Sequence, residues 1–344
     1  MKLLMITRKV DKDDGLAGFT YNWIKKLSEY LDKLYVICLE KGNYSGLPNN
    51  VEIYSLGKEK GKNRWKEFYN FQKFSKNLVP KVNGVFTHQN PEYGILIAPW
   101  CKIFRKKLIA WYAHGSITWK MFLLNFLTNK IVTSTSKGFR LKSKKLIVLH
   151  QGIDTKIFYF KEKNKDKKLT FLSVSRISET KNIHLMLDLI KEIKEKLNKK
   201  VNLKIVGLPI LEKDKIYLKR LKNKVRKLNL ENSVQFLGSV ANYKTPILYQ
   251  EADIFLNFSD TGSLDKAVLE AMSCGTIPFV SNEAFKEILK PISNLLYIEK
   301  DDLSFNNINK IIDINYNLRR QLRKYIKDNH SLNELIKKII NLFK

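Results

Sequence analysis

The sequence predicts an α/β protein made of two doubly wound domains, each built on a parallel β-sheet. Short apolar runs rich in β-branched and aromatic residues alternate with amphipathic helical patterns along almost the whole chain. Because these runs are continuously apolar, helices should cover both faces of each sheet, which is typical of parallel strands. A charged, non-periodic stretch at residues 160–168 divides the alternation into two series. We therefore expect two domains that face each other across a cleft.

The order of these runs predicts the domain boundaries. An N-terminal domain should cover residues 1–157 and a C-terminal domain residues 158–325, with a last helix, about 326–344, packing back on the first domain. Ligands of such domains bind at the carboxyl ends of the strands. The expected strands lie at residues 2–7, 33–39, 51–56, 84–88, 107–114, 130–135, 145–150, 169–175, 202–208, 234–239, 254–258, 276–281 and 295–299, and expected helices include 183–197, 212–228 and 316–343.

The composition of the chain limits the cellular compartments in which the protein is expected. Three cysteines without metal-ligand spacing favour a reducing environment over a disulfide framework. The apolar start of the chain is too short for a signal peptide and is expected to form the first strand. No apolar run approaches the roughly 20 residues that cross a bilayer. We therefore expect a cytoplasmic protein, either free or peripheral at the inner face of the cell membrane.

The charge is strongly positive and unevenly placed. Lys and Arg number 63 against 33 Asp and Glu, a net charge of +30, and no acidic residue lies between Glu92 and Asp154. Such a surface attracts anionic partners such as phospholipid head groups, lipid-linked phosphates or nucleic acid. Within this gap, the segment 116–130 combines aromatic and aliphatic residues with lysines at its margins. It fits a buried core helix and a membrane-contacting interfacial helix equally well.

Residues 260–263, with the sequence DTGS, match the loop that carries a catalytic carboxylate in pepsin-like aspartic proteases. Such a site needs an all-β domain and a second copy of the loop, whereas this single copy stands between an expected strand and an expected helix at 264–273. We therefore reject the protease interpretation. The backbone N–H groups of Ser263, Leu264 and Asp265, at the start of the helix, instead suit a phosphate or sugar hydroxyls.

Three further side chains of the C-terminal half suit a nucleotide. Glu270 lies two turns into the same helix among apolar neighbours, where a carboxylate needs a partner. Vicinal ribose hydroxyls would serve, and a surface ion pair with a lysine is the alternative. Arg176 and Lys181 flank the loop after the strand at 169–175. The planar guanidinium of Arg176 and the compact ammonium group of Lys181 together suit a diphosphate.

The N-terminal half offers weaker candidates. Gly15 and Gly18 form a glycine-rich turn without the full dinucleotide-binding fingerprint, so both a close approach to a ligand and an ordinary flexible loop remain open. The Asp-x-Asp spacing within residues 11–14 can hold a metal, but capping of the loop explains it better. His114 ends an expected strand and should point into the cleft as a donor, acceptor or proton shuttle. A structural histidine is the alternative there.

Taken in order, these segments resemble the pattern of glycosyltransferase family 4, whose members have the GT-B architecture of two Rossmann-like domains. The resemblance covers most of the chain and rests on the order and spacing of several short motifs. These are LHQGID followed by Phe158, SVSRISETKN around Arg176 and Lys181, KIVGLP, and LEAMSCGTIPFVS around Glu270.

The resemblance implies transfer of a sugar from a UDP- or GDP-sugar to a lipid-linked or cell-surface glycan, with retained anomeric configuration and without a metal or other cofactor. Glu270 would hold the ribose, and Arg176 and Lys181 would neutralise the leaving diphosphate. His114 would contact the donor sugar near the reacting carbon, and Gly18 would lie close to the phosphate or acceptor.

One position departs from the family pattern. Relatives commonly carry a sugar-contacting glutamate at the position of Gly262, with seven residues between it and the glutamate at 270. Asp260 and Asp265 flank this gap and either could replace it, while Lys266 could add charge near the phosphates. Two other functions stay open: an epimerase that acts on nucleotide sugars, and a basic nucleic-acid-binding protein. The absence of a nucleic-acid-binding motif counts against the second.

Overall fold

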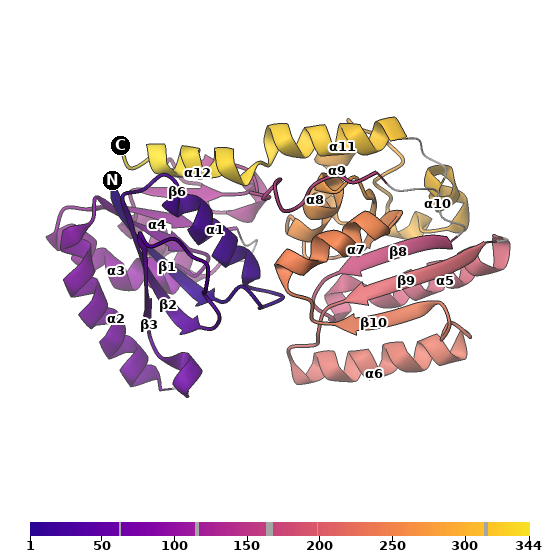
Figure 1. The fold of residues 1–344 in the computed structure, drawn as a ribbon, viewed down its shortest axis with the longest axis horizontal. Helices are drawn as coiled ribbons and strands as arrows, with labels where there is room; N and C mark the ends of the chain where they lie inside the picture. The colour runs from indigo at the N-terminus through magenta and orange to yellow at the C-terminus, as the bar shows by residue number, and fades with distance from the viewer. Residues whose placement is uncertain (62, 114–116, 163–167, 198, 313–315) are drawn as a thin grey trace. The chain divides into compact units, whose positions relative to one another are not determined.

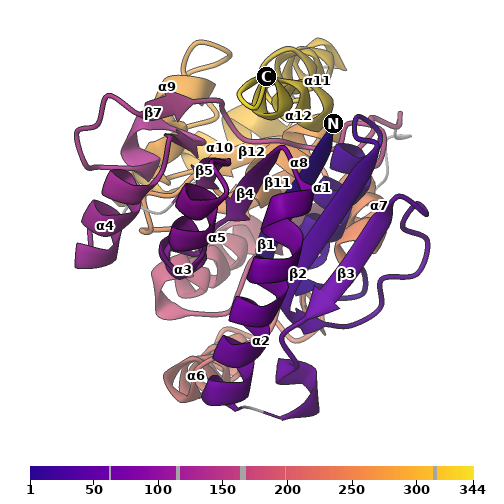
Figure 2. The same ribbon diagram turned by 90° about the vertical axis from the view of Figure 1, so that its left-hand side faces the viewer.

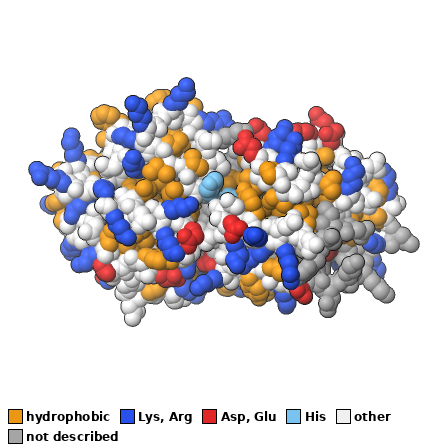
Figure 3. All heavy atoms as spheres, turned by 90° about the horizontal axis from the view of Figure 1, so that it is seen from above, with side chains coloured by type: hydrophobic (Ala, Val, Ile, Leu, Met, Phe, Trp, Pro, Cys, Tyr) orange, Lys and Arg blue, Asp and Glu red, His pale blue; other side chains and the backbone are white. Residues whose placement is uncertain are grey.

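The computed structural model describes residues 1–61, 63–113, 117–162, 168–197, 199–312 and 316–344. The chain forms two compact units (Figure 1). Unit 1 comprises Met1–Gly152 and Leu332–Lys344, and unit 2 comprises Ile153–Ser331. Lys and Arg side chains are spread between hydrophobic ones on the face seen in Figure 3, as the net charge of +30 requires. The three cysteines are buried and free.

The two passages of the chain between the units are paired with each other. The backbone N–H of Ile153 donates to the carbonyl oxygen of His330 at 2.7 Å, and Ile153 forms an isolated parallel bridge with Ser331. The units therefore divide at Gly152 and Ser331, whereas the sequence predicts boundaries after 157 and near 325. The prediction rests on the composition of the linker, which does not reveal this pairing.

Unit 1 is built on a parallel seven-stranded sheet with the order β3-β2-β1-β4-β5-β6-β7. One face carries α2, α3 and α4, with α3 packed against both neighbours, and the other face carries α1 packed against α12 (Figures 1 and 2). The elements are β1 (Lys2–Val10), α1 (Gly18–Ser28), β2 (Lys33–Lys41), β3 (Val51–Ser55), α2 (Arg64–Leu78), β4 (Gly84–His88), α3 (Pro91–Ile103), β5 (Lys107–Trp111), α4 (Trp119–Leu127), β6 (Lys130–Thr133), β7 (Leu146–Val148) and α12 (Leu332–Asn341).

The alternation of side chains along the central strand β1 explains why both faces need helices. Leu3 and Met5 belong to the core under α1 and α12, whereas Leu4 and Ile6 belong to the core under α2 and α3. All four side chains are buried. Successive residues of a strand point to opposite faces, so a strand that is apolar throughout must be covered on both sides.

The final helical segment is two helices, not the single piece that the sequence predicts at 316–343. α11 (Tyr316–Asn329) belongs to unit 2 and α12 to unit 1, and buried His330 stands between them. Apolar residues of α12 recur at the spacing of one helix face, and that face is buried on unit 1. The apolar periodicity continues through both helices, so the sequence does not mark the break.

Unit 2 is built on a parallel five-stranded sheet with the order β10-β9-β8-β11-β12. The expected strand at residues 295–299 forms only an isolated bridge between Tyr297 and Val280. The elements are β8 (Lys168–Val174), α5 (Ile183–Lys196), β9 (Lys200–Val206), α6 (Glu212–Lys227), β10 (Val234–Gly238), α7 (Thr245–Glu251), β11 (Ile254–Asn257), α8 (Lys266–Ser273), β12 (Ile277–Val280), α9 (Lys286–Leu289), α10 (Phe305–Ile312) and α11.

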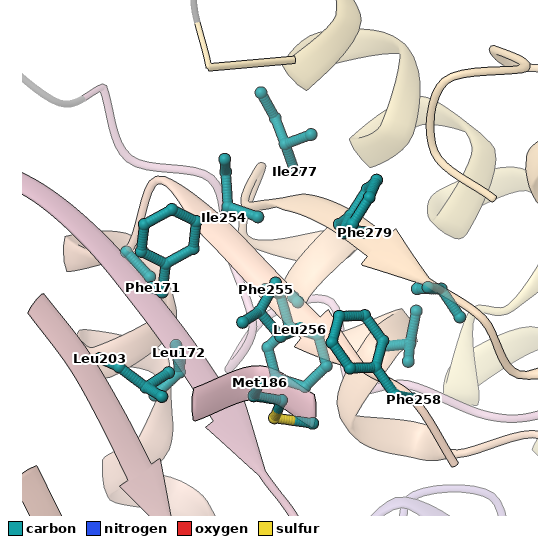
Figure 4. Close-up of a cluster of buried hydrophobic side chains, with 14 of the residues drawn as sticks. Phe171, Leu172, Met186, Leu203, Ile254, Phe255, Leu256, Phe258, Ile277 and Phe279 are labelled. Carbon is teal, nitrogen blue, oxygen red and sulfur yellow. The ribbon is translucent and has the colours of Figure 1, made fainter. Parts of the chain in front are cut away.

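The core of unit 2 fixes the starting points of the loops that follow its strands. Figure 4 shows Phe171 and Leu172 of β8 beside side chains of β11 and β12, with Met186 reaching in from α5. Phe258, the first residue after β11, is fully buried in the same cluster. Both sheets are parallel and covered by helices, as the sequence predicts.

A glycine allows two loops of unit 2 to come into contact at the strand ends. Gly207, directly after β9, has a φ of +136°, and a side chain at this position would collide with the carbonyl oxygen of Ser175. The backbone N–H of Ser175 in turn donates to the carbonyl oxygen of Val206 at 3.0 Å. Only glycine fits this close approach without strain.

We predict that Gly207→Ala destabilises unit 2 by about 3 kcal/mol or more, because it adds a steric collision to an unfavourable backbone conformation. Gly238→Ala is the matched control: its φ is +70° and its added methyl group meets nothing within 4 Å, so its cost should be about 1 kcal/mol. Urea unfolding followed by circular dichroism measures both. Equal costs for the two variants would contradict the role of the contact.

Candidate functional site

The candidate site of unit 2 lies where its strand order reverses. β8 is followed along the chain by β9 on one side, while β11 occupies its other side. Loops that leave the carboxyl ends of two such strands diverge and leave room for a ligand. Residues 175–182 follow β8 and residues 258–265 follow β11. The sequence-predicted side chains of the C-terminal half come from these two loops and from α8.

An ion pair joins the two loops. The ammonium group of Lys181 donates to both carboxylate oxygens of Asp265, at 2.9 and 2.8 Å, and to the hydroxyl of Ser259 at 3.1 Å. The amide of Asn257 donates to Oδ2 of Asp265 at 2.9 Å. The carboxylate therefore has two partners, and the three donors of the ammonium group are all engaged.

Asp260 is held by a second set of contacts. Its backbone N–H donates to the carbonyl oxygen of Thr180 at 2.9 Å, and Oδ2 accepts a hydrogen bond from the amide of Asn182 at 2.7 Å. Oδ1 forms an ion pair with Lys300. Burial alone would raise the pKa of Asp260, but the contacts with Lys300 and Asn182 hold it below its ordinary value.

The segment between these two aspartates is a tight turn. Gly262 has a φ of +59°, in the left-handed region. The amide of Asn282 donates to the carbonyl oxygen of Ser263 at 2.9 Å, and Leu264 is buried. α8 begins at Lys266 with Asp265 as its N-cap residue, two residues later than the sequence predicts. The loop therefore continues through Leu264, because that side chain enters the core instead of starting the helix.

Glu270 is buried in α8 with two hydrogen-bond donors. The amide of Asn242 donates to Oε1 at 3.2 Å and the hydroxyl of Tyr249 donates to Oε2 at 3.0 Å. Burial raises the pKa of Glu270, while these donors and nearby Lys266 act in the opposite direction. Burial likewise lowers the pKa of Lys266, which the charge of Glu270 partly offsets. The two groups therefore stabilise each other's charge within an environment that disfavours both.

Arg176 is a cation of a different kind from Lys181. It is half-buried in the loop after β8, and its guanidinium makes no ion pair with any described residue. Lys181 is already committed to Asp265. In the part of the chain that the structure describes, Arg176 is therefore the more available of the two predicted phosphate-binding cations.

The predicted glycine-rich turn lies in unit 1. Gly18 begins α1 and is buried, and Gly15 stands in the preceding turn. Asp14 accepts hydrogen bonds from the backbone N–H groups of Leu16 and Ala17 at 2.8 and 2.7 Å. Burial by itself would lower the pKa of Lys9, but hydrogen bonds and charge from Asp14 and Glu40 raise it above its ordinary value. The aspartates of this turn thus bind backbone and a lysine.

His114 lies outside the described residues, as do its neighbours at 115 and 116. Among the residues that are described, no three His, Cys, Asp or Glu side chains gather as a set of metal ligands. No helix in the described part of the chain has the length and hydropathy needed to cross a membrane.

Several residues of the site carry no signal that sequence reasoning used. Asn182 and Asn257 orient the two aspartates, and Asn242 and Tyr249 hold Glu270. Asn182 has a left-handed φ of 50°. Its position directly after Lys181, a predicted phosphate-binding cation, is the one sequence signal that could have indicated it as a site residue. Asn257 contacts Asp265 across a single loop, and Asn242 and Tyr249 contact Glu270 from separate segments; a single sequence displays none of these contacts.

The fold and this site define a class of α/β proteins that bind ligands where parallel strands end and a helix begins. A family model described as "Glycosyl transferases group 1" matches residues 154–329, just over half of the chain. The chain belongs to this family of enzymes.

Two characterised relatives match part of the chain. Alpha-monoglucosyldiacylglycerol synthase of Streptococcus pneumoniae is 35% identical over 115 residues, which are 32% of this chain and 24% of that protein. Mannosylfructose-phosphate synthase of Agrobacterium fabrum is 30% identical over 106 residues, 30% of this chain and 23% of that protein. The matched stretch thus spans about a quarter of the length of these relatives.

Solved structures resemble the chain over almost its whole length. Anabaena Alr3699/HepE in complex with UDP-glucose has a TM-score of 0.75 at 16% identity, covering 99% of this chain and 100% of that one. Sucrose-phosphate synthase from Thermosynechococcus elongatus has a TM-score of 0.74 at 14% identity, covering 100% and 98%. At these identities the likeness shows the fold, and it confirms the predicted class of two parallel-sheet, Rossmann-like units of the GT-B type.

The two aspartates of the loop should differ in their contribution to stability. We predict that Asp265→Asn lowers the free energy of unfolding by about 2 kcal/mol, because it leaves Lys181 without its counter-charge in a mostly buried place. The side chain of Asp265 is 18% exposed and that of Asp260 is 47% exposed. Asp260→Asn should therefore cost less than about 1 kcal/mol. Urea unfolding compares the two, and the reverse order would refute the prediction.

Glu270 should make stability depend on pH. Its folded-state pKa lies above the ordinary 4.5, so above pH 4.5 the folded protein holds this proton longer than the unfolded chain. The contribution of Glu270 to stability is therefore complete below pH 4.5 and is lost as pH rises through the folded pKa. Glu270→Gln removes this loss. Calorimetry between pH 4.5 and 8 should show the variant gaining stability relative to the parent protein, and parallel curves would argue against it.

Proposed function

We propose that the protein is a retaining glycosyltransferase of the family 4 type that moves a sugar from a UDP- or GDP-sugar to a lipid-linked or cell-surface glycan. One observation carries the proposal. Lys181 from the loop after β8 meets Asp265 at the start of α8, at the strand ends where the sheet order reverses. Cations beside a helix N-terminus at such a place suit the diphosphate of a nucleotide sugar.

The diphosphate would be bound by Arg176, Lys181 and the backbone N–H groups at the start of α8. Lys181 is fully engaged without a ligand, so donor binding must exchange at least its contact with Ser259 for a phosphate oxygen. Lys266, the first residue of α8, would add positive charge at the start of that helix. We further propose that these side chains neutralise the leaving group without a metal or other cofactor.

Glu270 is proposed to hold the ribose. A carboxylate offers about four acceptor positions, and Asn242 and Tyr249 occupy two of them. The two remaining positions suit the vicinal hydroxyls of the sugar. The raised pKa of Glu270, which results from burial, reflects a carboxylate kept in a dry environment in which hydrogen bonds to its charged form are strong.

Asp260 is the better of the two candidates for the sugar contact that Gly262 lacks. Its carboxylate is more exposed than that of Asp265, and its counter-ion Lys300 is itself partly exposed. Asp265 is instead tied to Lys181. We therefore assign recognition of the sugar hydroxyls to Asp260 and positioning of Lys181 to Asp265.

The chemistry required of the protein is positioning and charge stabilisation. The bond between the sugar and the diphosphate breaks through an oxocarbenium-like state, and cations near the phosphates favour departure of the leaving group. Exclusion of water protects the donor from hydrolysis. His114 is proposed to contact the donor sugar, and Gly15 and Gly18 the phosphate or acceptor.

The relatives support a choice of first substrates. Alr3699/HepE is described in complex with UDP and with UDP-glucose, which favours UDP-sugars as the first donors to test. The Streptococcus pneumoniae relative is named for a glucosylated diacylglycerol, which supports a lipid-based acceptor. We propose that the protein works in the cytoplasm at the inner face of the membrane, where its basic N-terminal unit would meet anionic lipid.

We predict that Glu270→Ala and Lys181→Ala each abolish sugar transfer, because the ribose or the diphosphate loses its charged partner. Glu195→Ala, an exposed glutamate of α5 in an i,i+4 ion pair, is the matched control and should keep full activity. A panel of UDP- and GDP-sugars scored by product formation and by thermal stabilisation provides the measurement. Full activity of either site variant in a folded protein would reject the site.

A further inference from the structure

Helix α4 presents an aromatic face to the surface of unit 1. Trp119, Phe122 and Phe126 are 69%, 55% and 78% exposed, and their spacing of three and four residues places them on one side of the helix. The opposite side buries Met121 and Leu124. The sequence left open whether this segment is a core helix or an interfacial one. The structure shows a helix anchored by two side chains that leaves its three largest aromatic residues uncovered.

The helix is held firmly enough to serve as a platform. Leu124 packs against Gly94 of α3 so closely that a side chain at Gly94 would collide with it. The ammonium group of Lys145 donates to the carbonyl oxygens of Asn125, Phe126 and Thr128, at 2.8, 3.0 and 2.7 Å, which satisfies the C-terminal end of the helix. At the other end, Lys120 pairs with Glu92 of α3.

The surrounding segments are basic without counter-charges. No acidic residue lies between Glu92 and Asp154. Several exposed basic side chains of this stretch make no ion pair with any residue that the structure describes, among them Lys102, Arg105, Lys130, Arg140, Lys142 and Lys144. These cations belong to α3, to the loops before β5 and β7 and to the start of β6, so unit 1 combines unpaired basic side chains with the exposed aromatic side chains of α4.

We propose that α4 lies in the interfacial region of an anionic lipid bilayer, with Trp119, Phe122 and Phe126 among the head groups and upper acyl chains. Exposed Ile117 adds an aliphatic contact directly before the helix. Basic residues attract anionic lipid and aromatic and aliphatic side chains insert. A bilayer fits better than nucleic acid, because the exposed face of the helix itself offers hydrocarbon and no row of polar side chains. The proposal rests on the proposed function only in giving the enzyme access to a lipid-based acceptor.

Co-sedimentation of the full chain with vesicles tests this. Vesicles of phosphatidylcholine with phosphatidylglycerol should bind the protein, and vesicles of phosphatidylcholine alone should bind it far less. Added salt should weaken the binding, because it screens the attraction between Lys or Arg and the lipid. The double substitution Trp119→Ala with Phe126→Ser should weaken binding about tenfold or more, since interfacial affinity follows the buried apolar area.

A matched control uses another exposed tryptophan of unit 1. Trp65 on α2 is 85% exposed and lies outside the acid-free stretch, so Trp65→Ala should bind vesicles as the parent protein does. Quenching of tryptophan fluorescence by brominated lipid should likewise fall in Trp119→Phe and persist in Trp65→Phe. Failure of the parent protein to bind anionic vesicles, or equal binding by the α4 double variant, overturns the proposal. So does binding of an oligonucleotide that competes fully with vesicles.

The same variants separate this proposal from the proposed activity. α4 belongs to unit 1, whereas Lys181 and Glu270 belong to unit 2. The α4 double variant should therefore keep the thermal stabilisation given by UDP or a UDP-sugar. Vesicle binding without nucleotide binding would reject the glycosyltransferase site and keep the membrane surface, and nucleotide binding without vesicle binding would do the reverse.

Discussion

The ion pair between Lys181 and Asp265 joins the two loops on which the candidate site depends. Each loop leaves a different strand, and the strand order of unit 2 directs the loops apart. Asp260 accepts a hydrogen bond from the amide of Asn182, and its backbone N–H donates to the carbonyl oxygen of Thr180, so several further contacts join the same pair of loops. A ligand that binds there meets a surface already organised by charge. Binding of a ligand there would therefore need little further ordering of the two loops, and its entropic cost would be small.

The burial of Glu270, with partly buried Lys266 beside it, shows how the site is supported by the core behind it. Tyr249 donates a hydrogen bond to Glu270. Burial and the neighbouring carboxylate both raise the pKa of Tyr249. A carboxylate in such a place costs stability unless its partners remain in position. Tyr249 itself is fully buried in the same hydrophobic cluster as Phe258, which holds its hydroxyl beside Glu270. The packing of the hydrophobic core of unit 2 therefore supports the hydrogen bonds to the carboxylate of Glu270.

Much of the fold could be predicted from the sequence, because apolar runs and helical periodicity are local. β4 begins and ends where the sequence predicts, and α5 and α6 each end one residue earlier. The expected strand at 295–299 pairs with β12 only around Tyr297 and Val280, although Leu296 and Tyr297 pack in the core. The predictions of a continuous helix through His330 and of a start of α8 at Leu264 were wrong for a related reason, because each boundary depends on a tertiary contact. Among the site residues, charged side chains at strand ends were predictable, whereas the asparagines and tyrosine that orient them were not.

The discontinuous composition of unit 1 has a consequence for how the protein is made. The apolar side of β1 that bears Leu3 and Met5 is covered in part by α12, which follows all of unit 2 in the sequence. During synthesis, unit 2 can complete its core before that helix exists, since all of its residues precede Leu332. The apolar side of β1 is then covered by α12 only after all of unit 2 has been synthesised, and its apolar surface stays open until that point. The core of unit 1 is therefore completed after the residues of unit 2 are in place.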